Sequence, residues 1–243
     1  MIRVGVIGGR GRMGTAVCAA VDADDDLDLV ARVGRGDALD GLVDAGAQVA
    51  VDFTTPDSVA ANVRFCIEGG IRAVVGTTGL SADDLVDLSR RAEANGVGVL
   101  IAPNFALGAV LMMSFARKAA RFYDAVEIIE RHHDKKLDSP SGTALRTASL
   151  MNEERGAPWN VPAGREVVAG SRGGEREGVH VHSLRLPGSV AHQEVIFGGV
   201  GETLTIRHDS LDRSSFMPGV ILAIKRVDTL DGVIVGLEHL LEV

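Results

Sequence analysis

A basic segment with two adjacent histidines, residues 130–143, holds the side chains best suited to acid–base chemistry. It reads ERHHDKKLDSPSGT. Histidine changes charge near neutral pH, and lysine can neutralise an anion or donate a proton. Ser141, Gly142 and Thr143 read as a helix start, where backbone N–H groups attract a carboxylate. The segment therefore favours a small anion as its ligand, with an ordinary solvated basic turn as the alternative.

The two histidines are poor candidates for a metal site. Adjacent residues on an extended chain point to opposite sides, so His132 and His133 cannot face one ion together, and the neighbouring lysines repel a cation. The two cysteines, Cys18 and Cys66, lie far away in apolar helical patterns without CxxC spacing. They are expected to be buried free thiols of a protein in the reducing cytoplasm. We expect no metal.

A glycine-rich turn follows the first apolar run of the chain. Residues 8–14 read GGRGRMG, which gives Gly9, Gly11 and Gly14 the GxGxxG spacing between a predicted strand and a predicted helix. Glycine permits a tight turn and a close approach of the backbone to a pyrophosphate, and the helix N-terminus supplies N–H donors. This context favours dinucleotide binding over a merely structural turn.

The end of the second predicted strand bears on which dinucleotide is bound. An acidic residue is expected there as a ligand of the adenosine ribose, but the sequence holds Arg32, Gly34 and Arg35. Without a carboxylate to repel it, a 2′-phosphate can pair with Arg32 or Arg35. We expect NADPH to be accepted at least as well as NADH. Two solvated arginines after a strand are the alternative.

Alternating β-rich and amphipathic runs between residues 2 and 101 must position the glycine turn. The predicted strands are 2–7, 28–33, 48–53, 71–75 and 97–101, and the predicted helices between them are 12–22, 37–44, 57–68 and 82–95. Ser81 is the predicted N-cap of the last of these helices. Repeated strand–helix–strand units predict an α/β fold with a doubly wound, Rossmann-like parallel sheet.

The pattern changes after residue 106. The predicted elements are a helix over 107–122, a strand over 126–129, a second helix from Gly142, an exposed loop over 156–178, alternating antiparallel strands over 179–208 and a helix over 218–227. The last helix is expected to return to the first domain. We predict a dinucleotide-binding domain of residues 1–106 with 215–243, and a second, α+β domain of residues 107–214 with a mainly antiparallel sheet.

Composition limits the partners of these domains. A chain of 243 residues with 46% hydrophobic residues can bury a core, and its length fits one large domain or two modest ones. The formal net charge of −8 argues against a nucleic-acid or basic membrane-surface protein. No apolar stretch reaches the length of a membrane span. We therefore expect a soluble cytoplasmic protein with a small-molecule partner, and neither nucleic acid nor membrane.

Several separated motifs, taken in order, resemble those of the dihydrodipicolinate reductase family over nearly the whole chain. The most specific is the segment 130–143, because the glycine turn alone is shared by many enzymes. The other motifs are Gly11-Arg12-Met13-Gly14, Asp52-Phe53-Thr54, Gly76-Thr77-Thr78-Gly79, Ala102-Pro103-Asn104-Phe105 and Arg207-His208-Asp209-Ser210. The resemblance implies NAD(P)H-dependent reduction of 4-hydroxy-tetrahydrodipicolinate to tetrahydrodipicolinate with loss of water, in lysine and diaminopimelate biosynthesis.

The resemblance also implies roles for individual residues. His132 matches the catalytic acid/base of the family, and Lys136 matches its proposed proton donor. The positions that match those binding the dicarboxylate substrate are His133, Ser141, Gly142 and Thr143. The positions that match those binding the cofactor are Gly8, Gly9, Arg10, Gly11, Arg12, Met13, Gly34, Arg35, Gly76, Thr77, Thr78, Ala102, Pro103, Asn104 and Phe105.

One of these positions departs from the family pattern. Gly34 stands where many members have an acidic ribose ligand, while Arg35 matches a position used for the NADP phosphate. We therefore expect dual use of NADPH and NADH. The family is typically a homotetramer built through the sheet of the second domain, and residues 179–208 could supply that surface. The alternatives are a same-fold reductase or dehydratase of a related cyclic imino dicarboxylate, and a non-catalytic dinucleotide-sensing module.

Overall fold

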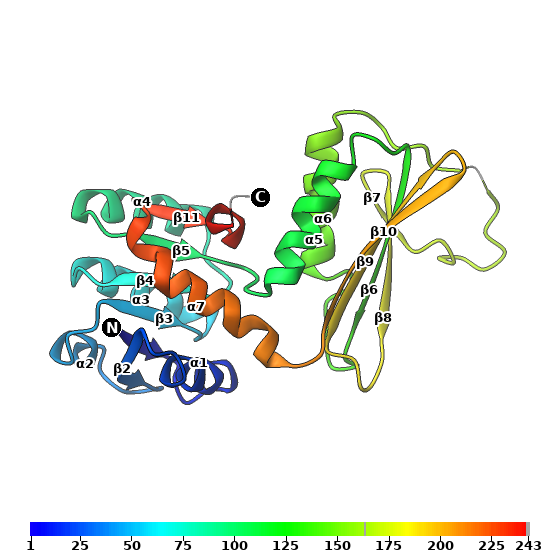
Figure 1. The fold of residues 1–243 in the computed structure, drawn as a ribbon. Coiled ribbons are helices and arrows are strands. Elements are labelled where there is room, and N and C mark those ends of the chain that lie inside the picture. Colours follow the sequence, from blue (N-terminus) through cyan, green and yellow to red (C-terminus); the bar gives the residue numbers. More distant parts are fainter. Residues whose placement is uncertain (163, 242–243) are drawn as a thin grey trace. The chain divides into compact units, whose positions relative to one another are not determined.

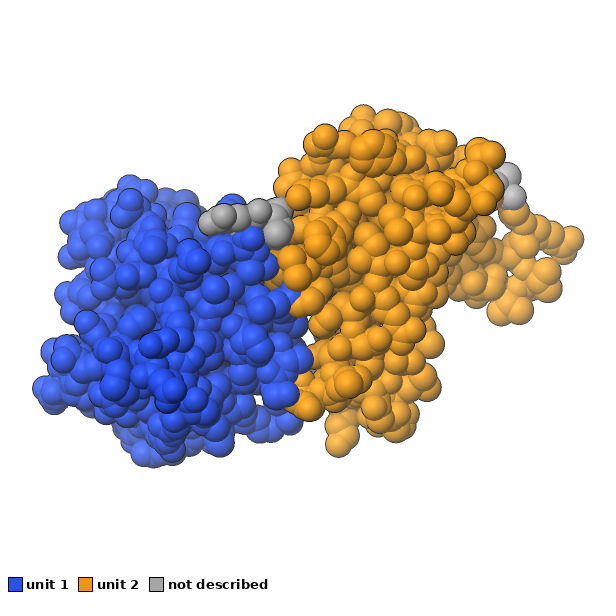
Figure 2. All heavy atoms as spheres, in the orientation of Figure 1, with its two compact units in different colours: residues 1–107, 213–243 blue, residues 108–212 orange. Residues whose placement is uncertain are grey.

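The computed structural model describes residues 1–162 and 164–241, and the chain folds into two compact units (Figures 1 and 2). Unit 1 comprises Met1–Leu107 and Arg213–Val243, and unit 2 comprises Gly108–Asp212. The chain thus leaves unit 1 once, builds unit 2 and returns. That unit 1 binds the dinucleotide and unit 2 the substrate stays a prediction.

Unit 1 is built on a six-stranded sheet in which every neighbouring pair of strands is parallel. The strands are β1 (Ile2–Ile7), β2 (Leu27–Val33), β3 (Val49–Asp52), β4 (Arg72–Val75), β5 (Val99–Ile101) and β11 (Val233–Val235), in the order β11-β5-β4-β3-β1-β2. The predicted doubly wound parallel sheet is confirmed. The edge strand β11 was not predicted, because three half-exposed residues give almost no periodic signal.

Helices connect these strands. They are α1 (Arg12–Asp22), α2 (Asp40–Asp44), α3 (Pro56–Glu68), α4 (Ala82–Asn95) and α7 (Met217–Arg226), with short 3-10 helices at Arg213–Phe216, Val227–Thr229 and Leu237–Leu240. The prediction for Ser81 is confirmed, since its hydroxyl accepts the Asp84 N–H at 3.1 Å in a complete capping box. The predicted helix 37–44 is wrong in its first turn, because α2 begins only at Asp40.

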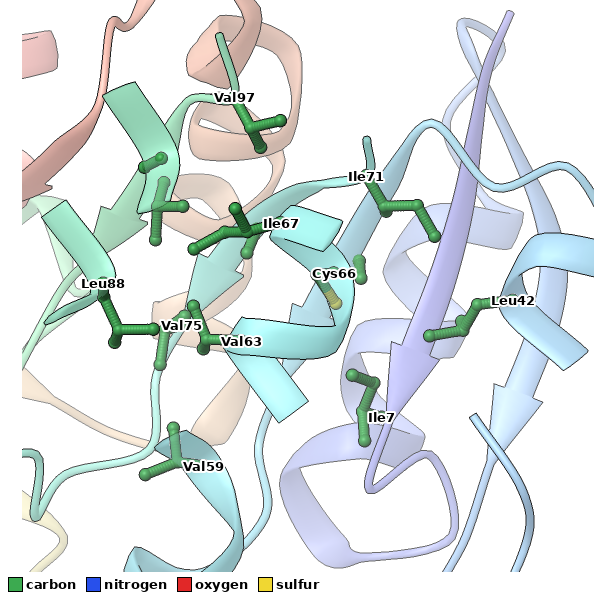
Figure 3. Close-up of a cluster of buried hydrophobic side chains, with 14 of the residues drawn as sticks. Ile7, Leu42, Val59, Val63, Cys66, Ile67, Ile71, Val75, Leu88 and Val97 are labelled. Carbon is green, nitrogen blue, oxygen red and sulfur yellow. The ribbon is translucent and has the colours of Figure 1, made fainter. Parts of the chain in front are cut away.

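Both faces of the unit 1 sheet are covered. Figure 3 shows one of the two cores, in which Val63 and Ile67 of α3 and Leu88 of α4 pack against strand residues such as Val75. The alternate strand positions are also buried, and on that side α1 and α7 pack against each other. A sheet buried on both faces leaves its carboxyl edge as the place where loops and ligands meet. Cys18 and Cys66 are buried free thiols, as predicted.

Unit 2 packs two helices, α5 (Leu107–Ala119) and α6 (Gly142–Arg155), with a five-stranded sheet. The strands are β6 (Ala125–His132), β7 (Gly174–Arg176), β8 (Val179–Arg185), β9 (Ala191–Gly199) and β10 (Glu202–Ser210), in the order β10-β9-β6-β8-β7. Three of the four neighbouring pairs are antiparallel, which confirms a mainly antiparallel sheet. The pair β6–β8 is parallel, because α6 forms a crossover between these two strands.

One element of unit 2 corrects the sequence prediction. Residues 156–178 were expected to form a loop throughout, yet Gly174–Arg176 pairs with β8 as the edge strand β7. All three of its residues are exposed. A strand with no buried face carries no hydrophobic alternation, so the pattern could not reveal it.

Candidate active site

The carboxyl end of β1 turns into α1 through a loop that requires glycine at two positions. Gly8 has a φ of 80°, a conformation that L side chains rarely adopt, and a Cβ on Gly14 would overlap the carbonyl oxygen of Gly8. The N–H groups of Gly8 and Gly9 both donate to the Val33 carbonyl, at 2.8 and 3.1 Å. No described side chain caps α1 at Gly11, so its first N–H groups can donate to a phosphate. The loop fits a dinucleotide pyrophosphate.

The end of β2 carries a charged cluster beside this loop. Asp37 accepts a hydrogen bond from the Gly34 N–H at 2.8 Å and forms an ion pair with Arg10 at 2.9 Å. The Arg10 side chain lies against Gly34, because a Cβ added to Gly34 would be 3.0 Å from Cδ of Arg10. Arg32 is committed elsewhere, because its guanidinium lies 2.6 Å from the Asp22 carboxylate. Arg35 is exposed.

A buried carboxylate organises the loops after β3 and β4. Asp52 is 2% exposed, and it accepts hydrogen bonds from the hydroxyl of Thr77 at 2.5 Å and from the amide of Asn62 at 2.7 Å. The same Thr77 oxygen accepts the Thr54 N–H at 2.7 Å. The Thr77 side chain is thus used within the protein and joins two loops. Its predicted contact with the cofactor is therefore best assigned to its backbone.

Aromatic rings pack beneath the loops that follow β4 and β5. A Cβ on Gly76 would overlap the ring of Phe53, and the rings of Phe53 and Phe105 lie 5.7 Å apart between centroids. Phe105 is buried, and the side chain of Asn104 accepts the Ala106 N–H at 2.9 Å. The turn 102–105 is therefore held by its own side chains.

All the predicted cofactor-binding residues belong to unit 1. They fall in four segments, 8–13, 34–35, 76–78 and 102–105, which follow β1, β2, β4 and β5. Since these strands are parallel, their carboxyl ends share one edge of the sheet, which is where doubly wound folds bind nucleotides. The structure brings the segments to one edge. The contact of each residue with a cofactor stays a prediction.

The buried face of the unit 2 sheet changes from apolar to polar toward one end. Ile128 of β6 lies in register with Val181 of β8 and Val195 of β9. Two residues further along β6, Glu130 lies in register with Ser183 and Gln193. The polar end of this face coincides with the end of β6, where the basic segment begins.

Glu130 is the centre of this polar end. It is fully buried, and its carboxylate lies 2.5 Å from Nδ1 of His132. Arg185 donates to both of its oxygens, at 2.8 and 2.9 Å, and the Ser141 N–H donates to it at 3.2 Å. Burial opposes ionisation, but the hydrogen bonds from His132 and Arg185 outweigh it and hold the pKa of Glu130 at about 2. Glu130 is therefore a carboxylate at neutral pH.

The loop after His132 places its lysine against an acidic neighbour. Nζ of Lys136 lies 2.8 Å from both carboxylate oxygens of Asp138. His133 is exposed, and its carbonyl accepts the Lys136 N–H at 3.2 Å. Arg185 also donates to the carbonyl of Asp138 at 2.6 Å, which ties the loop to the end of β8. The structure thus places His132, His133 and Lys136 within one short segment of unit 2.

The N-terminus of α6 adds an anion-binding element. Ser141 is its N-cap, and the serine hydroxyl accepts the Ala144 N–H at 3.2 Å. The predicted substrate-binding role of Ser141 thus competes with capping, since its N–H is also used by Glu130. Gly142 and Thr143 follow in the first turn, where N–H groups have no partner within the helix. These two residues are the better candidates for holding a carboxylate.

The sequence prediction missed three residues of this region. Glu130 was noted only as part of a charged segment, while Asp138 and Arg185 were given no role. One signal was available for Glu130, because residues two apart on a strand share a face, so Glu130 and His132 had to lie side by side. Nothing in the sequence alone indicated that Arg185 would pair with a residue so distant along the chain.

The described part of the chain offers neither a metal-binding cluster nor a membrane-spanning helix. Residues 1–162 and 164–241 contain no group of three or more His, Cys, Asp or Glu side chains arranged to hold a metal ion. Within the same residues, no helix is both long enough and apolar enough to cross a membrane.

Family models match both parts of the chain. The model described as "Dihydrodipicolinate reductase, N-terminus" matches residues 2–105, and the model described as "Dihydrodipicolinate reductase, C-terminus" matches residues 108–241. The boundary between the two matches falls at the boundary between the two units.

Individual relatives agree. The 4-hydroxy-tetrahydrodipicolinate reductase of Nocardia farcinica is 55% identical over 245 residues, covering 99% of this chain and 99% of that protein. That of Corynebacterium diphtheriae is 54% identical over 246 residues, covering 100% and 99%. The structure of a dipicolinate-bound dihydrodipicolinate reductase from Paenisporosarcina sp. TG-14 matches with a TM-score of 0.91 at 39% identity, covering 98% of this chain and 99% of that chain.

A more distant match shows the fold alone. An amine dehydrogenase from Mycobacterium smegmatis has a TM-score of 0.66 at 14% identity, covering 96% of this chain and 94% of that chain. Fold and comparisons together define an oxidoreductase that uses a nicotinamide dinucleotide. More narrowly, the chain belongs to the dihydrodipicolinate reductase family. The resemblance stated from the sequence is confirmed.

Proposed function

We propose that this chain reduces 4-hydroxy-tetrahydrodipicolinate to tetrahydrodipicolinate with loss of water, using NADPH or NADH, in lysine and diaminopimelate biosynthesis. The observation that carries the proposal is the cluster at the polar end of unit 2. There a histidine at the end of β6 is held by a buried carboxylate, and a lysine and a helix N-terminus follow the strand. This set suits a substrate that is both a dianion and a proton acceptor.

The reaction assigns work to each of these groups. The substrate would lose its hydroxyl group and a ring proton as water, a bound nicotinamide would supply a hydride, and one further proton would complete the reduced product. Lys136 and His132 are the proposed proton carriers, since each has a nitrogen that can carry a proton to the substrate. The backbone N–H groups of Gly142 and Thr143, with His133 and Ser141, are the proposed carboxylate ligands.

The glycine loop of unit 1 supports the cofactor half of the proposal. Its two obligatory glycines suit a pyrophosphate, as does the start of α1, which has no side-chain cap at Gly11. For NADPH, the exposed Arg35 is the proposed partner of the 2′-phosphate. Arg32 is the weaker candidate, because it is already paired with Asp22. For NADH, Asp37 is a carboxylate at the end of β2 that could accept ribose hydroxyls in place of the acid missing at Gly34.

A homotetramer is part of the proposal. The face of the unit 2 sheet that points away from its buried core carries Ile129, Leu184 and Ile196 at alternate positions. Apolar residues on such a face suit burial against another copy of the chain. Analytical ultracentrifugation tests this, and a monomer at working concentration would contradict it. We also propose a cytoplasmic location, because both cysteines are free thiols, as a reducing compartment would keep them.

The central test is an NAD(P)H oxidation assay in which the preceding synthase generates the substrate in place. Wild type should be active, and Lys136→Ala should lower kcat by about 100-fold or more, the usual worth of a positioned proton donor. Lys135→Ala is the matched control, since it removes a neighbouring exposed lysine of the same loop and should leave kcat unchanged. An inactive wild type would contradict the reaction, and an active Lys136→Ala would contradict the role of Lys136.

A further inference from the structure

The environment of Glu130 is unusually complete for a buried carboxylate. Oε2 of Glu130 accepts hydrogen bonds from His132 Nδ1 and Arg185 Nη1. Oε1 accepts hydrogen bonds from Arg185 Nη2 and the Ser141 N–H. A buried charge is costly unless it is paired and hydrogen-bonded, and here every contact is with a donor. Three separate parts of unit 2 therefore meet on one side chain: β6, β8 and the start of α6.

The charge of Glu130 decides the orientation of His132. An ionised carboxylate can only accept hydrogen bonds, so Nδ1 of His132 must carry a proton and donate it. The ring is then fixed in one orientation, and Nε2 is its remaining functional atom.

We propose that Glu130 is the positioning residue of His132, and that through Ser141 it sets the place of this proton carrier relative to the carboxylate-binding turn of α6. The inference rests on the proposed function and adds a residue to it. Glu130 acts only through its neighbours, since its own oxygens are fully used. Arg185 keeps the carboxylate in place, and the loop after His132 adds two further charges, Lys136 and Asp138.

Unit 2 contains a natural comparison on the same strand. Glu127 bonds His182 at 2.7 Å and Arg172 at 2.8 Å, so it also joins a histidine and an arginine. Glu127 lies three residues from Glu130, on the opposite face of β6, and its side chain is 40% exposed. The same chemical trio is therefore present away from the start of α6. Glu127→Gln is the matched control for Glu130→Gln.

The first experiment is the pH profile of kcat for wild type and both variants, each checked for folding by circular dichroism. Glu130→Gln should lower kcat about 100-fold, with a smaller change in KM. The pH profile of this variant should also differ from that of wild type, because the carboxylate that holds the His132 ring is gone. Glu127→Gln should keep the wild-type profile. A wild-type profile in Glu130→Gln, or an equal shift in both variants, would overturn the proposal.

A double-mutant cycle separates positioning from independent catalysis. If Glu130 acts through His132, then Glu130→Gln in a His132→Gln background should lower kcat less than about threefold further. Multiplying losses would show that Glu130 acts by another route and would overturn the proposal. The cycle isolates the interaction between Glu130 and His132, because a general structural defect caused by Glu130→Gln would lower kcat equally with and without His132.

One measurement is independent of activity and of whether the variants fold. Nitrogen-15 NMR of histidine-labelled wild type reports which ring nitrogen of His132 carries a proton. A proton on Nδ1 supports the proposal, and a neutral ring protonated only on Nε2 overturns it. Wild type that lacks reductase activity defeats the proposed function. Active wild type with an unprotonated Nδ1 defeats this inference alone.

Discussion

Lys136 and Asp138 form an ion pair in which both carboxylate oxygens of Asp138 lie 2.8 Å from Nζ of Lys136. Hydrogen bonds from Lys136 hold the pKa of Asp138 below its usual range, so the pair is charged at neutral pH. A dianionic substrate that approaches the Lys136 ammonium must therefore compete with Asp138. The ammonium proposed as proton donor is restrained by its own loop.

The first prediction is that Asp138→Asn tightens the binding of a dicarboxylate. A partly exposed ion pair is worth up to about 1 kcal/mol, so the Kd should fall about two- to fivefold. The loop should keep its shape, because Arg185 bonds the backbone of Asp138 and not its side chain. Titration calorimetry with dipicolinate measures the effect, and Asp134→Asn in the same loop serves as the control. Weaker binding by Asp138→Asn would show that Asp138 helps to position Lys136.

The second prediction concerns the choice of cofactor. Arg35→Ala should lower kcat/KM for NADPH about tenfold, the scale of one hydrogen bond to a charged group, and change the value for NADH less than twofold. Arg32→Ala is the matched control. Because the Arg32 guanidinium is bonded to Asp22, this substitution should leave the ratio of kcat/KM for NADPH to that for NADH unchanged. Steady-state kinetics with both cofactors decide. A large NADH preference that Arg35→Ala does not alter would contradict dual use.

The third prediction follows from the ionisation of Glu130. Its pKa is about 2 in the folded protein against 4.5 for the free group, so it stabilises the fold above pH 4.5 and this contribution is lost as the pH falls toward 2. The shift corresponds to about 3 kcal/mol. Between pH 5 and 2 the free energy of unfolding of wild type should fall by about that much more than that of Glu130→Gln. Urea denaturation at several pH values measures both, and parallel curves would contradict the prediction.

The sequence predicted best what is decided locally. The glycine turn, the cap at Ser81 and the strand–helix alternation of unit 1 depend on neighbouring residues, so spacing alone reveals them. His132 and Lys136 were singled out because their residue types and the motif around them are distinctive, and their catalytic roles stay a prediction. Local signals therefore gave the architecture of unit 1 and the position of the basic loop.

What the sequence could not give depends on distant partners. The charge pattern after the second strand offered both Arg32 and Arg35, and only the fold showed that Asp22 lies beside Arg32. Glu130 looked like one of several solvated charges, and only the pairing of β6 with β8 brought Arg185 to it and made its burial possible. The parallel pair β6–β8 has the same cause, because its register is set by a crossover and not by either strand.

The last prediction tests the glycine loop against an ordinary glycine of the same unit. A Cβ on Gly14 would overlap the backbone oxygen of Gly8, which no rotamer change can relieve. Gly14→Ala should therefore lower the free energy of unfolding by about 1–3 kcal/mol and weaken NADH binding at least about tenfold. Gly41 lies in α2, and no heavy atom lies within 4 Å of a Cβ added there. Gly41→Ala should therefore raise the free energy of unfolding by up to about 1 kcal/mol through helix propensity. Thermal unfolding and fluorescence titration measure the pair. Normal cofactor binding by a folded Gly14→Ala would mean that the backbone of this turn does not hold the pyrophosphate.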